Sequence, residues 1–531
     1  MDTATKAIRA VLACMVLSVA APVALSEQES QQAAPVAEAA ATAVPQVDPG
    51  RVREVALLMA SLADRDARVR DRALIALRAY RPLTDAEFDR VARLLQDDPS
   101  EEVRRRVVEA QKWLGRPDRA PEVLSAALDD QDERVRSQVF EVLSECGVER
   151  AAALRIVTRG MESDHERTRS AAAWAASQHA PLTEAEVQWL AGWLSDESRS
   201  VRDSAAKTIV TAGPARGAAV SALAAAAQRT EAPTPNAAMA LGRMVPPVAQ
   251  AVPAVRRALA APDAALRSEA ARALGSFGEA AHPAIPDLIA ALDDTSGEVV
   301  RHAAWALGDL GPPARAATPK LRGMLSDADA RQAAAACYAL YRIEGEAVQL
   351  MPVLVRALGE RDPGKRRLAA YVLGVMGADA KQAVPALAST LENAVLHTGG
   401  LRTWYEYAWA LSRMGPAAQD ALPTMRLCLK KYPDDVALHA AVAAVEGNVD
   451  EHMPALLAGL KGDRYEWSRK MLAAAALGCL GPRAEAALPE LEALCADRNG
   501  DVRLMAEHAA RCVRGRPPDN LVDEVTWWLR R

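Results

Sequence analysis

The chain has 531 residues, which is long enough for several globular domains or for one array of repeats. It contains only 10 Trp, 8 Tyr and 3 Phe residues, so alanine and leucine must supply most of the core. That composition favours thin layers of packed helices, and the formal charge of −5 opposes a general nucleic-acid binder.

The first 26 residues have the pattern of a secretory signal peptide. Lys6 and Arg9 precede an apolar run over residues 10–25, which is short for a membrane span of about 20 residues. Small residues end this run, so we expect cleavage after Ser26 and export to the periplasm or the medium, with no membrane span left. The alternative is an uncleaved anchor. Residues 27–50 are rich in Ala, Gln and Pro and are expected to form a flexible spacer.

A period of 33 residues runs through residues 51–515. The segment WALGDLG, which contains Gly308, is preceded 33 residues earlier by RALGSFG and followed two periods later by YVLGVMG. Fourteen such units fit into this range, with one interval of 32 residues and one of 38 residues. A fixed period of this size indicates a stack of repeated supersecondary units.

Each unit contains two helical patterns. The first pattern begins at a recurring proline, which suits the first turn of a helix. The second carries Val-Arg, several small residues and Ala-Leu-Gly, whose glycine is expected to supply a left-handed helix cap. Acidic and arginine residues at fixed positions are expected to form ladders between units.

Residues 285–311, IPDLIAALDDTSGEVVRHAAWALGDLG, show the whole pattern. This segment resembles the HEAT repeat family, in particular its HEAT-like (phycobilisome-lyase) type. The resemblance implies an all-α fold, an α-α superhelix or solenoid of about fourteen two-helix HEAT repeats. It is specific for the fold and carries little information about function.

One unit departs from the pattern at residues 230–235, where the sequence reads TEAPTP and the Val-Arg dipeptide is lost. We expect the stacking of repeats to be disturbed at this irregular junction. A rigid kink and a hinge are the two interpretations.

Four aromatic residues occupy one repeat position in consecutive units, three residues before the Gly308 column: Trp305, Tyr338, Tyr371 and Trp409. At about 100° per helical residue, Trp305 falls about 150° away from the core direction of its helix. We therefore expect these rings to form a stripe on the concave surface.

Arginine and further aromatic residues surround this stripe, a composition that is typical of anchors in protein interfaces. The predicted partner-binding residues are Trp305, Tyr338, Tyr371, Trp409, Arg301, Arg367 and Tyr405. The alternative is a half-buried column, because the same position holds residues of mixed character in other units: Ile75, Val108, Glu141, Trp174 and Lys207.

Two segments near the C-terminal end lie outside the regular period. The interval of 38 residues marks an insertion around residues 393–404, which is either a loop at a binding edge or a tolerated change of length. Residues 516–531 are expected to form a capping helix, with an interaction tail as the alternative. Its apolar side consists of Leu521, Val522, Val525, Trp528 and Leu529.

The sequence contains no constellation that is typical of catalysis or of a cofactor site. Cys479 and Cys512 are 33 residues apart, in matching columns, which predicts buried free thiols and no disulfide between them. The eight histidines form no HExxH motif and no pair with CxxC, so no metal is predicted. His165-Glu166 alone matches the dipeptide with which some HEAT-like hydroxylases bind iron, and four would be required.

These patterns favour a noncatalytic protein–protein interaction scaffold of the cell envelope, which binds a protein or peptide on the concave face of a HEAT superhelix. One alternative is a HEAT-like lyase that acts on a chromophore. A second is a HEAT-type DNA-binding protein, which export and the acidic charge oppose.

Overall fold

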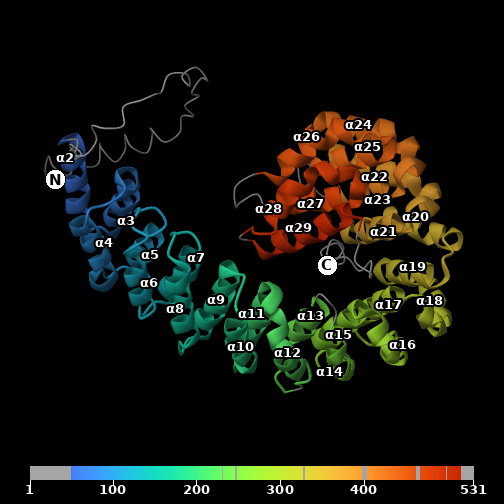
Figure 1. Cartoon of the computed structure of the whole chain (residues 1–531), viewed down its shortest axis with the longest axis horizontal. Coiled ribbons are helices and arrows are strands. Elements are labelled where there is room, and N and C mark those ends of the chain that lie inside the picture. Colours follow the sequence, from blue (N-terminus) through green and yellow to red (C-terminus); the bar gives the residue numbers. More distant parts are fainter. Residues whose placement is uncertain are drawn as a thin grey trace. The chain divides into compact units, whose positions relative to one another are not determined.

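The computed structural model describes residues 49–229, 231–244, 248–326, 329–397, 404–461, 467–497 and 499–515. Within these ranges the protein consists of α-helices joined by short turns and 3-10 segments, and no strand occurs. The helices form fourteen consecutive pairs, from α2–α3 to α28–α29 (Figure 1). This confirms the predicted all-α fold of about fourteen two-helix repeats.

Several predicted segments lie outside the described residues. They are the signal segment 1–26, nearly all of the spacer 27–50, the glycine turn within the insertion 393–404, and the C-terminal segment 516–531.

The chain forms two compact units, Met1–Ala175 and Ala176–Arg531. In the first unit, the first helices of the repeats are α2 (Pro49–Ser61), α4 (Asp85–Asp97), α6 (Ala120–Ala127) and α8 (Arg150–Met161). The second helices are α3 (Ala67–Ala76), α5 (Glu101–Ala110), α7 (Glu133–Leu143) and α9 (Glu166–Ala176).

The second unit contains the remaining ten pairs. Its first helices are α10 (Glu184–Gly192), α12 (Val220–Ala227), α14 (Val252–Ala258), α16 (Ile285–Ala291), α18 (Thr318–Gly323), α20 (Met351–Leu358), α22 (Val384–His397), α24 (Leu422–Lys431), α26 (Val449–Leu460) and α28 (Leu488–Leu494). Its second helices are α11 (Arg199–Val210), α13 (Pro235–Gly242), α15 (Ala264–Ser276), α17 (Gly297–Leu310), α19 (Ala330–Glu344), α21 (Pro363–Met376), α23 (Tyr405–Met414), α25 (Val436–Glu446), α27 (Trp467–Leu480) and α29 (Gly500–Val513).

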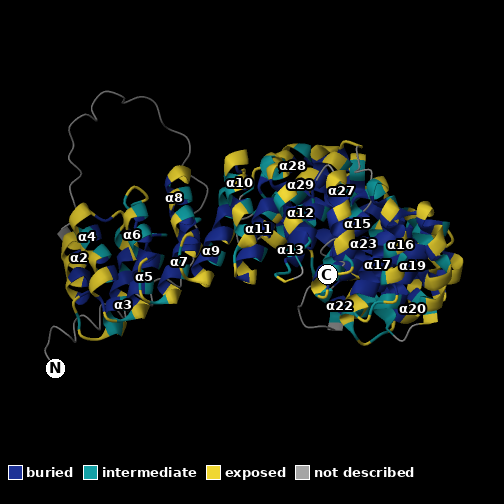
Figure 2. Ribbon diagram, turned by 90° about the horizontal axis from the view of Figure 1, so that it is seen from below, coloured by how far each residue is buried: buried dark blue, intermediate teal, exposed yellow. Residues whose placement is uncertain are grey.

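In the second unit the second helices pack side by side and form a continuous layer, as the close contacts of α13 with α15, α15 with α17 and α17 with α19 show. Alanines at the crossings allow the backbones to approach closely. Nearly every side chain of α17 is buried for this reason, and Figure 2 shows the dense burial of this layer.

The ends of the helices follow from their sequences. Aspartates cap the second helices, where their side chains accept backbone N–H groups, as Asp66, Asp132 and Asp435 do. Prolines occupy the first turn of most first helices, as expected. In α26, however, Pro454 lies inside the helix, which begins upstream at Val449.

The glycine of Ala-Leu-Gly does not cap the second helix, so that expectation is wrong. Gly308 lies inside α17, and the helix ends three residues later at Gly311, which has a φ of +69°. Gly374 and Gly377 repeat this arrangement in α21, with a φ of +57° at Gly377. The helix therefore terminates at the second glycine of the LGxxG pattern, which can adopt a positive φ without strain.

Buried ion pairs connect successive repeats, as predicted from the fixed charge positions. Arg70 Nε lies 2.6 Å from Asp98 Oδ2, and Arg104 Nε lies 2.7 Å from Asp130 Oδ2. In the second unit, Lys470 Nζ lies 3.0 Å from Asp497 Oδ2 at the equivalent position. These pairs hold the turns of neighbouring repeats together.

The second unit curves until its last described repeat meets an early one. Arg503 of α29 donates its Nη2–H to the carbonyl oxygen of Thr211, just after α11, over 3.1 Å. In both views α29 lies close to α11 (Figures 1 and 2). Across the inner side, Trp409 of α23 donates its Nε1–H to Cys479 Sγ of α27 over 3.2 Å. The inner side chains of this unit therefore pack against one another.

One helical stretch of the described residues, Trp467–Leu494, is apolar and long enough to cross a membrane by length and composition alone. It comprises α27, a 3-10 segment and α28. Gly481, with a φ of +60°, ends α27 before the 3-10 segment and α28. The stretch is therefore two separate helices of the repeats and not one straight helix.

Candidate interaction site

The structure brings the four aromatic residues Trp305, Tyr338, Tyr371 and Trp409 into one aromatic cluster. The ring centroids of Trp305 and Tyr338 lie 4.3 Å apart, and those of Trp305 and Tyr371 lie 5.4 Å apart. Tyr371 stacks on Trp409 at 5.4 Å, with 10° between the ring planes. The register of the repeats thus produces the predicted row of rings on α17, α19, α21 and α23.

The row is buried, so the expectation that it faces out onto a concave surface is wrong. The exposed fractions are 1 % for Trp305, Tyr338 and Tyr371 and 7 % for Trp409. The angular argument considered one helix alone, whereas each ring packs against the second helix of the neighbouring repeat.

The in-helix glycines provide the space for these rings. A Cβ at Gly308 would lie 2.7 Å from Cε1 of Tyr338, and a Cβ at Gly374 would collide with the indole of Trp409. The glycine of one repeat therefore leaves space for the aromatic ring of the next repeat, and this contact packs the two repeats together.

Polar groups of the cluster bind partners inside the unit. The Tyr338 hydroxyl donates a hydrogen bond to Asp309 Oδ1 of the preceding second helix. Trp409 donates its indole N–H to Cys479, as described above. These contacts fix the rings in the interior.

The remaining predicted partner-binding residues are also engaged. Arg301 is buried, and its Nη2 pairs with Glu298 Oε1 at 2.9 Å. Arg367 is half-buried, with Nε 3.2 Å from Oε1 of the buried Glu406. Burial raises the pKa of Glu406, and the Arg367 guanidinium opposes that shift.

Tyr405 completes the predicted set. Its side chain is buried, and burial raises the pKa of its hydroxyl well above the usual value. Of the seven predicted residues, Arg367 alone is appreciably accessible in this conformation. The set therefore forms a structural core and not a docking surface.

The cysteines of the described residues are free thiols, as predicted, but Cys479 and Cys512 are half-buried and not fully buried as expected. Cys146, Cys337 and Cys428 are fully buried, and burial raises the pKa of Cys337 to about 12 and that of Cys428 to about 11. Because the thiolate is the nucleophilic form, these two side chains are inert near neutral pH.

The first unit presents the same repeat position differently. Trp174 on α9 is 48 % exposed and Ile75 on α3 is 44 % exposed, although both are equivalent to the buried Trp305. Glu141 on α7 is exposed as well, and Val108 on α5 is buried. We name Ile75, Glu141 and Trp174 the first-unit face.

Charged side chains accompany the exposed tryptophan. Arg167 lies seven residues before Trp174 on α9, which places both on the same side of the helix. Arg167 Nε lies 3.6 Å from Glu133 Oε1 of α7, and both side chains are largely exposed. The sequence contained the signal for this face, because Trp174 occupies the aromatic column, but its isolation there gave it little weight.

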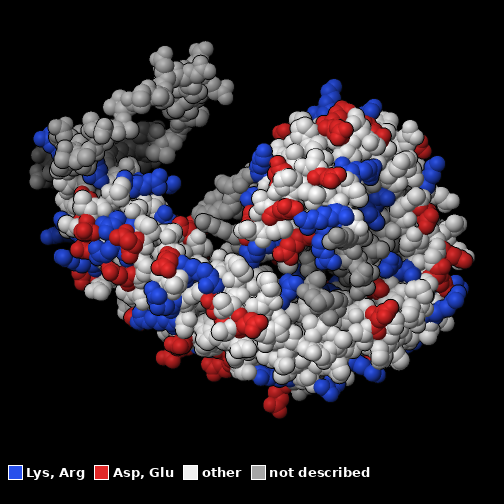
Figure 3. Space-filling model, in the orientation of Figure 1, with Lys and Arg blue, Asp and Glu red and all other residues white. Residues whose placement is uncertain are grey.

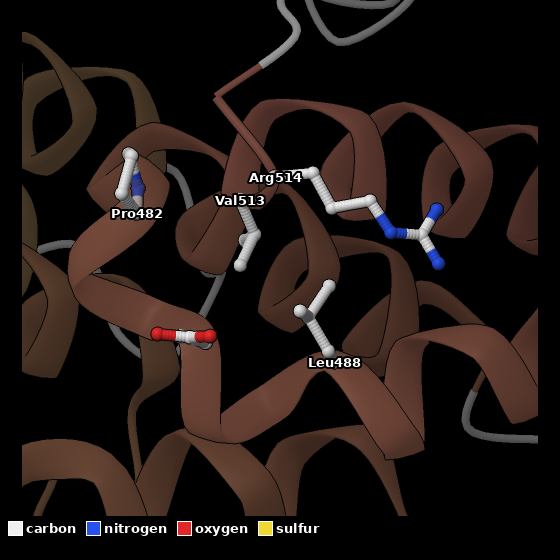
Figure 4. Close-up of a pocket in the computed structure, with 5 residues that line it drawn as sticks. Pro482, Leu488, Val513 and Arg514 are labelled. Carbon is white, nitrogen blue, oxygen red and sulfur yellow. The ribbon is translucent and has the colours of Figure 1, made fainter.

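A recess of about 530 Å³ lies at the end of the second unit, lined by Pro482, Glu485, Leu488, Val513 and Arg514 (Figure 4). Arg514 pairs with Glu492 and points away from Pro482. The lining offers one carboxylate and one guanidinium as its charged groups.

Comparison with known proteins agrees with the repeat pattern. A sequence model described as HEAT repeats matches residues 55–144, 88–177, 121–210, 220–308 and 285–356, which together make up more than half of the chain. No curated protein matches the sequence.

Solved structures of similar fold include yeast importin-β, Kap95p, with 12 % identity, a TM-score of 0.52, and coverage of 88 % of this chain and 73 % of the other. A structure of Kap95p that concerns its binding to RanGDP has 12 % identity, a TM-score of 0.51, and coverage of 90 % and 73 %. The CpcE–CpcF complex of phycocyanin lyase from Nostoc has 26 % identity and covers 46 % of this chain and 94 % of the other, at a TM-score of 0.36.

Proposed function

Since this chain belongs to the HEAT repeat family, we propose that it is an exported, noncatalytic scaffold that binds another protein through the second helices of its first unit. This assignment keeps the second helices of the repeats as the binding surface. It moves the anchor from the buried aromatic cluster to the first-unit face.

The observation that carries the proposal is the exposure of Trp174. The side chain is 48 % exposed, whereas Trp305 at the same repeat position is 1 % exposed. Tryptophan is the residue most enriched among the energetic anchors of protein interfaces. The exposed Ile75 adds apolar area at the same repeat position, and Glu141, Arg167 and Glu133 supply polar groups of the kind found at an interface rim.

The distribution of charge favours a protein over a nucleic acid as the partner. Basic and acidic side chains are interspersed on the face drawn in Figure 3, and the formal charge of the chain is −5. Nucleic-acid binding requires a basic surface that neutralises phosphates. A partner with an apolar pocket for an indole and a mixed polar rim fits the first-unit face.

Noncatalytic action and export rest on separate supports. Arg70 and Arg104 are paired with aspartates of the next repeat, and the buried thiols of Cys337 and Cys428 have raised pKa values. The basic and apolar N-terminal segment supports export. A solenoid of this fold with a protein ligand has a counterpart in the structure that concerns Kap95p and RanGDP.

The test uses two matched tryptophan variants. Trp174→Ala removes the proposed anchor, and Trp467→Ala removes a tryptophan of α27 that is 44 % exposed but lies in the second unit. Tagged wild-type and variant proteins capture partners from the envelope fraction, and the affinity of an identified partner is then measured with purified proteins.

We expect the Trp174→Ala variant to lose at least tenfold in affinity and the Trp467→Ala variant to bind normally, with unchanged circular dichroism in both. Equal binding by the two variants would place the partner site elsewhere. Recovery of the protein in the cytoplasmic fraction with residues 1–26 retained would contradict export.

A further inference from the structure

Two acidic side chains and one histidine meet at the turn between α25 and α26. Glu446 is the last residue of α25, and Glu451 and His452 lie in the first turns of α26. One ligand atom of each of these three residues lies within 4.8 Å of the other two. We name these residues the acid–histidine cluster.

The local sequence explains why they meet. Gly447 adopts the left-handed conformation, with a φ of +80°, and reverses the chain directly after Glu446. The helix α26 then begins at Val449, upstream of Pro454. Most other first helices of the second unit begin next to their proline, after a 3-10 segment. The additional helical turn of α26 carries Glu451 and His452.

The hydrogen bonds of a second histidine define which nitrogen of His452 is available. His439 Nε2 lies 2.8 Å from the carbonyl oxygen of Pro433, which can only accept, so this nitrogen carries a hydrogen. The Nδ1 atom of neutral His439 is then an acceptor. His452 Nδ1 lies 2.9 Å away and must donate to it. It follows that neutral His452 has a bare lone pair on Nε2.

This lone pair is buried and has no partner among the described residues. His452 is 5 % exposed, and its Nε2 has no hydrogen bond. A buried acceptor without a partner is unfavourable, and one nitrogen of the same ring lies within 4.8 Å of an oxygen of each of the two carboxylates. An oriented imidazole that donates its other N–H to a neighbour is the usual form of a metal-binding histidine.

The two carboxylates are each held by one oxygen. Arg426 Nε and Nη2 lie 2.8 Å and 2.7 Å from Glu446 Oε1, which leaves Oε2 for a ligand. Asn448 Nδ2 donates to Glu451 Oε2 over 2.8 Å, which leaves Oε1. The Arg426 guanidinium opposes a bound cation, but its side chain is 66 % exposed, so solvent screens its charge.

We propose that Glu446, Glu451 and His452 bind one divalent transition-metal ion of the zinc class, with His439 as the positioning residue for His452. One imidazole and two carboxylates form a donor set that zinc accepts, with a water molecule in the fourth position. Bond lengths of about 2.0–2.2 Å require the ligand atoms to draw together, which the exposed Glu451 can do by changing its rotamer.

The ion would link the end of α25 to the start of α26 and fix the turn between two repeats. The prediction from sequence that no histidine supports a metal site considered only contiguous motifs. The proposal is independent of the scaffold function, because no residue of the first-unit face takes part.

The experiment titrates metal-free full-length protein with Co²⁺, which reports tetrahedral sites by visible absorption, and then displaces it with Zn²⁺ in a calorimeter. We expect one saturable site per chain and a rise in the thermal unfolding midpoint on Zn²⁺ binding. His452→Gln should abolish the Co²⁺ absorption, and Glu451→Gln should weaken Zn²⁺ binding at least tenfold. His439→Gln should weaken it about tenfold, as expected for a second-sphere group.

His282→Gln is the control, because His282 lies in the 3-10 segment before α16, outside the cluster. This variant should bind like the wild type. A Co²⁺ spectrum that is unchanged by His452→Gln, or the lack of any saturable site in the wild type, would overturn the proposal. Glu451 is exposed, so its variant keeps the test valid if His452→Gln fails to fold.

Discussion

Trp174 and Trp305 occupy the same repeat position. Replacing each by alanine distinguishes a tryptophan that binds a partner from one that stabilises the packing of the repeats. Full burial of a tryptophan removes about 150–250 Å² from water, and at about 25 cal/mol per Å² this corresponds to roughly 4–6 kcal/mol. Trp305 is 1 % exposed and contacts the rings of Tyr338 and Tyr371. We expect Trp305→Ala to lower the free energy of unfolding by about 3–5 kcal/mol.

Trp174 already exposes 48 % of its surface, so its truncation forfeits much less burial. We expect Trp174→Ala to cost about 1.5–2.5 kcal/mol, because only about half of the indole surface is buried and about half of the loss at Trp305 therefore applies. The difference between the two variants should therefore be about 1.5–2.5 kcal/mol.

Urea unfolding monitored by far-ultraviolet circular dichroism measures both losses without relying on tryptophan fluorescence. Repeat arrays can unfold in segments, so the midpoint of each transition is compared between the wild type and the variants. Equal losses for the two variants, or a larger loss for Trp174→Ala, would refute the assignment of a buried cluster and an open first-unit face.

Three further outcomes follow from buried ionisable groups. Arg367→Met removes the cation beside the buried Glu406 and should lower stability by about 2 kcal/mol. Glu406→Gln should cost less in thermal unfolding, and the reverse order would contradict the pairing. Burial, with Arg511 adding to it, lowers the pKa of His508 to about 4. Because the unfolded value is about 6.5, the folded state binds fewer protons between these values, and stability is lost as the pH falls below about 6.5, by up to about 1.4 kcal/mol per unit. His508→Gln should flatten this slope between pH 7 and 5 in unfolding titrations, and identical slopes would show that the group does not contribute. Cys337, whose pKa is raised to about 12, should react with a disulfide reagent at pH 8 far more slowly in the native than in the unfolded protein, and rapid native labelling would contradict its burial.

The fold could be predicted from the sequence because each repeat encodes its own hairpin. The period of 33 residues, the N-terminal prolines and the aspartate caps act over short distances. The ladder between Arg70 and Asp98 was also predictable, since it joins adjacent repeats at a fixed spacing. These features depend on neighbouring residues alone.

The burial of the aromatic cluster could not be predicted in the same way. It depends on the curvature of the second unit, which sums small rotations over many repeats. The hydrogen bond between Trp409 and Cys479 spans 70 residues, and that between Arg503 and Thr211 spans 292 residues. No pattern within one repeat predicts such contacts.

The acid–histidine cluster escaped prediction for a local reason. Pro454 marked the expected start of the first helix, so Glu451 and His452 fell into a presumed turn. The structure extends α26 upstream to Val449 and brings both residues beside Glu446. A departure from the repeat pattern, and not the pattern itself, creates this group.

Repeat packing does not require a tryptophan at residue 174. The same position accepts Ile75, Val108, Glu141 and Lys207 in neighbouring repeats, which differ in size, shape and charge. A tryptophan of which nearly half is exposed keeps a large apolar area in water, and that area lowers the free energy only when something covers it. In the second unit, the rings of adjacent repeats cover Trp305. In the first unit the neighbouring position on α7 holds Glu141, which is itself exposed, and nearly half of the Trp174 surface stays in water. For this reason the exposed Trp174, and not the buried aromatic cluster, is the better guide to where a partner binds.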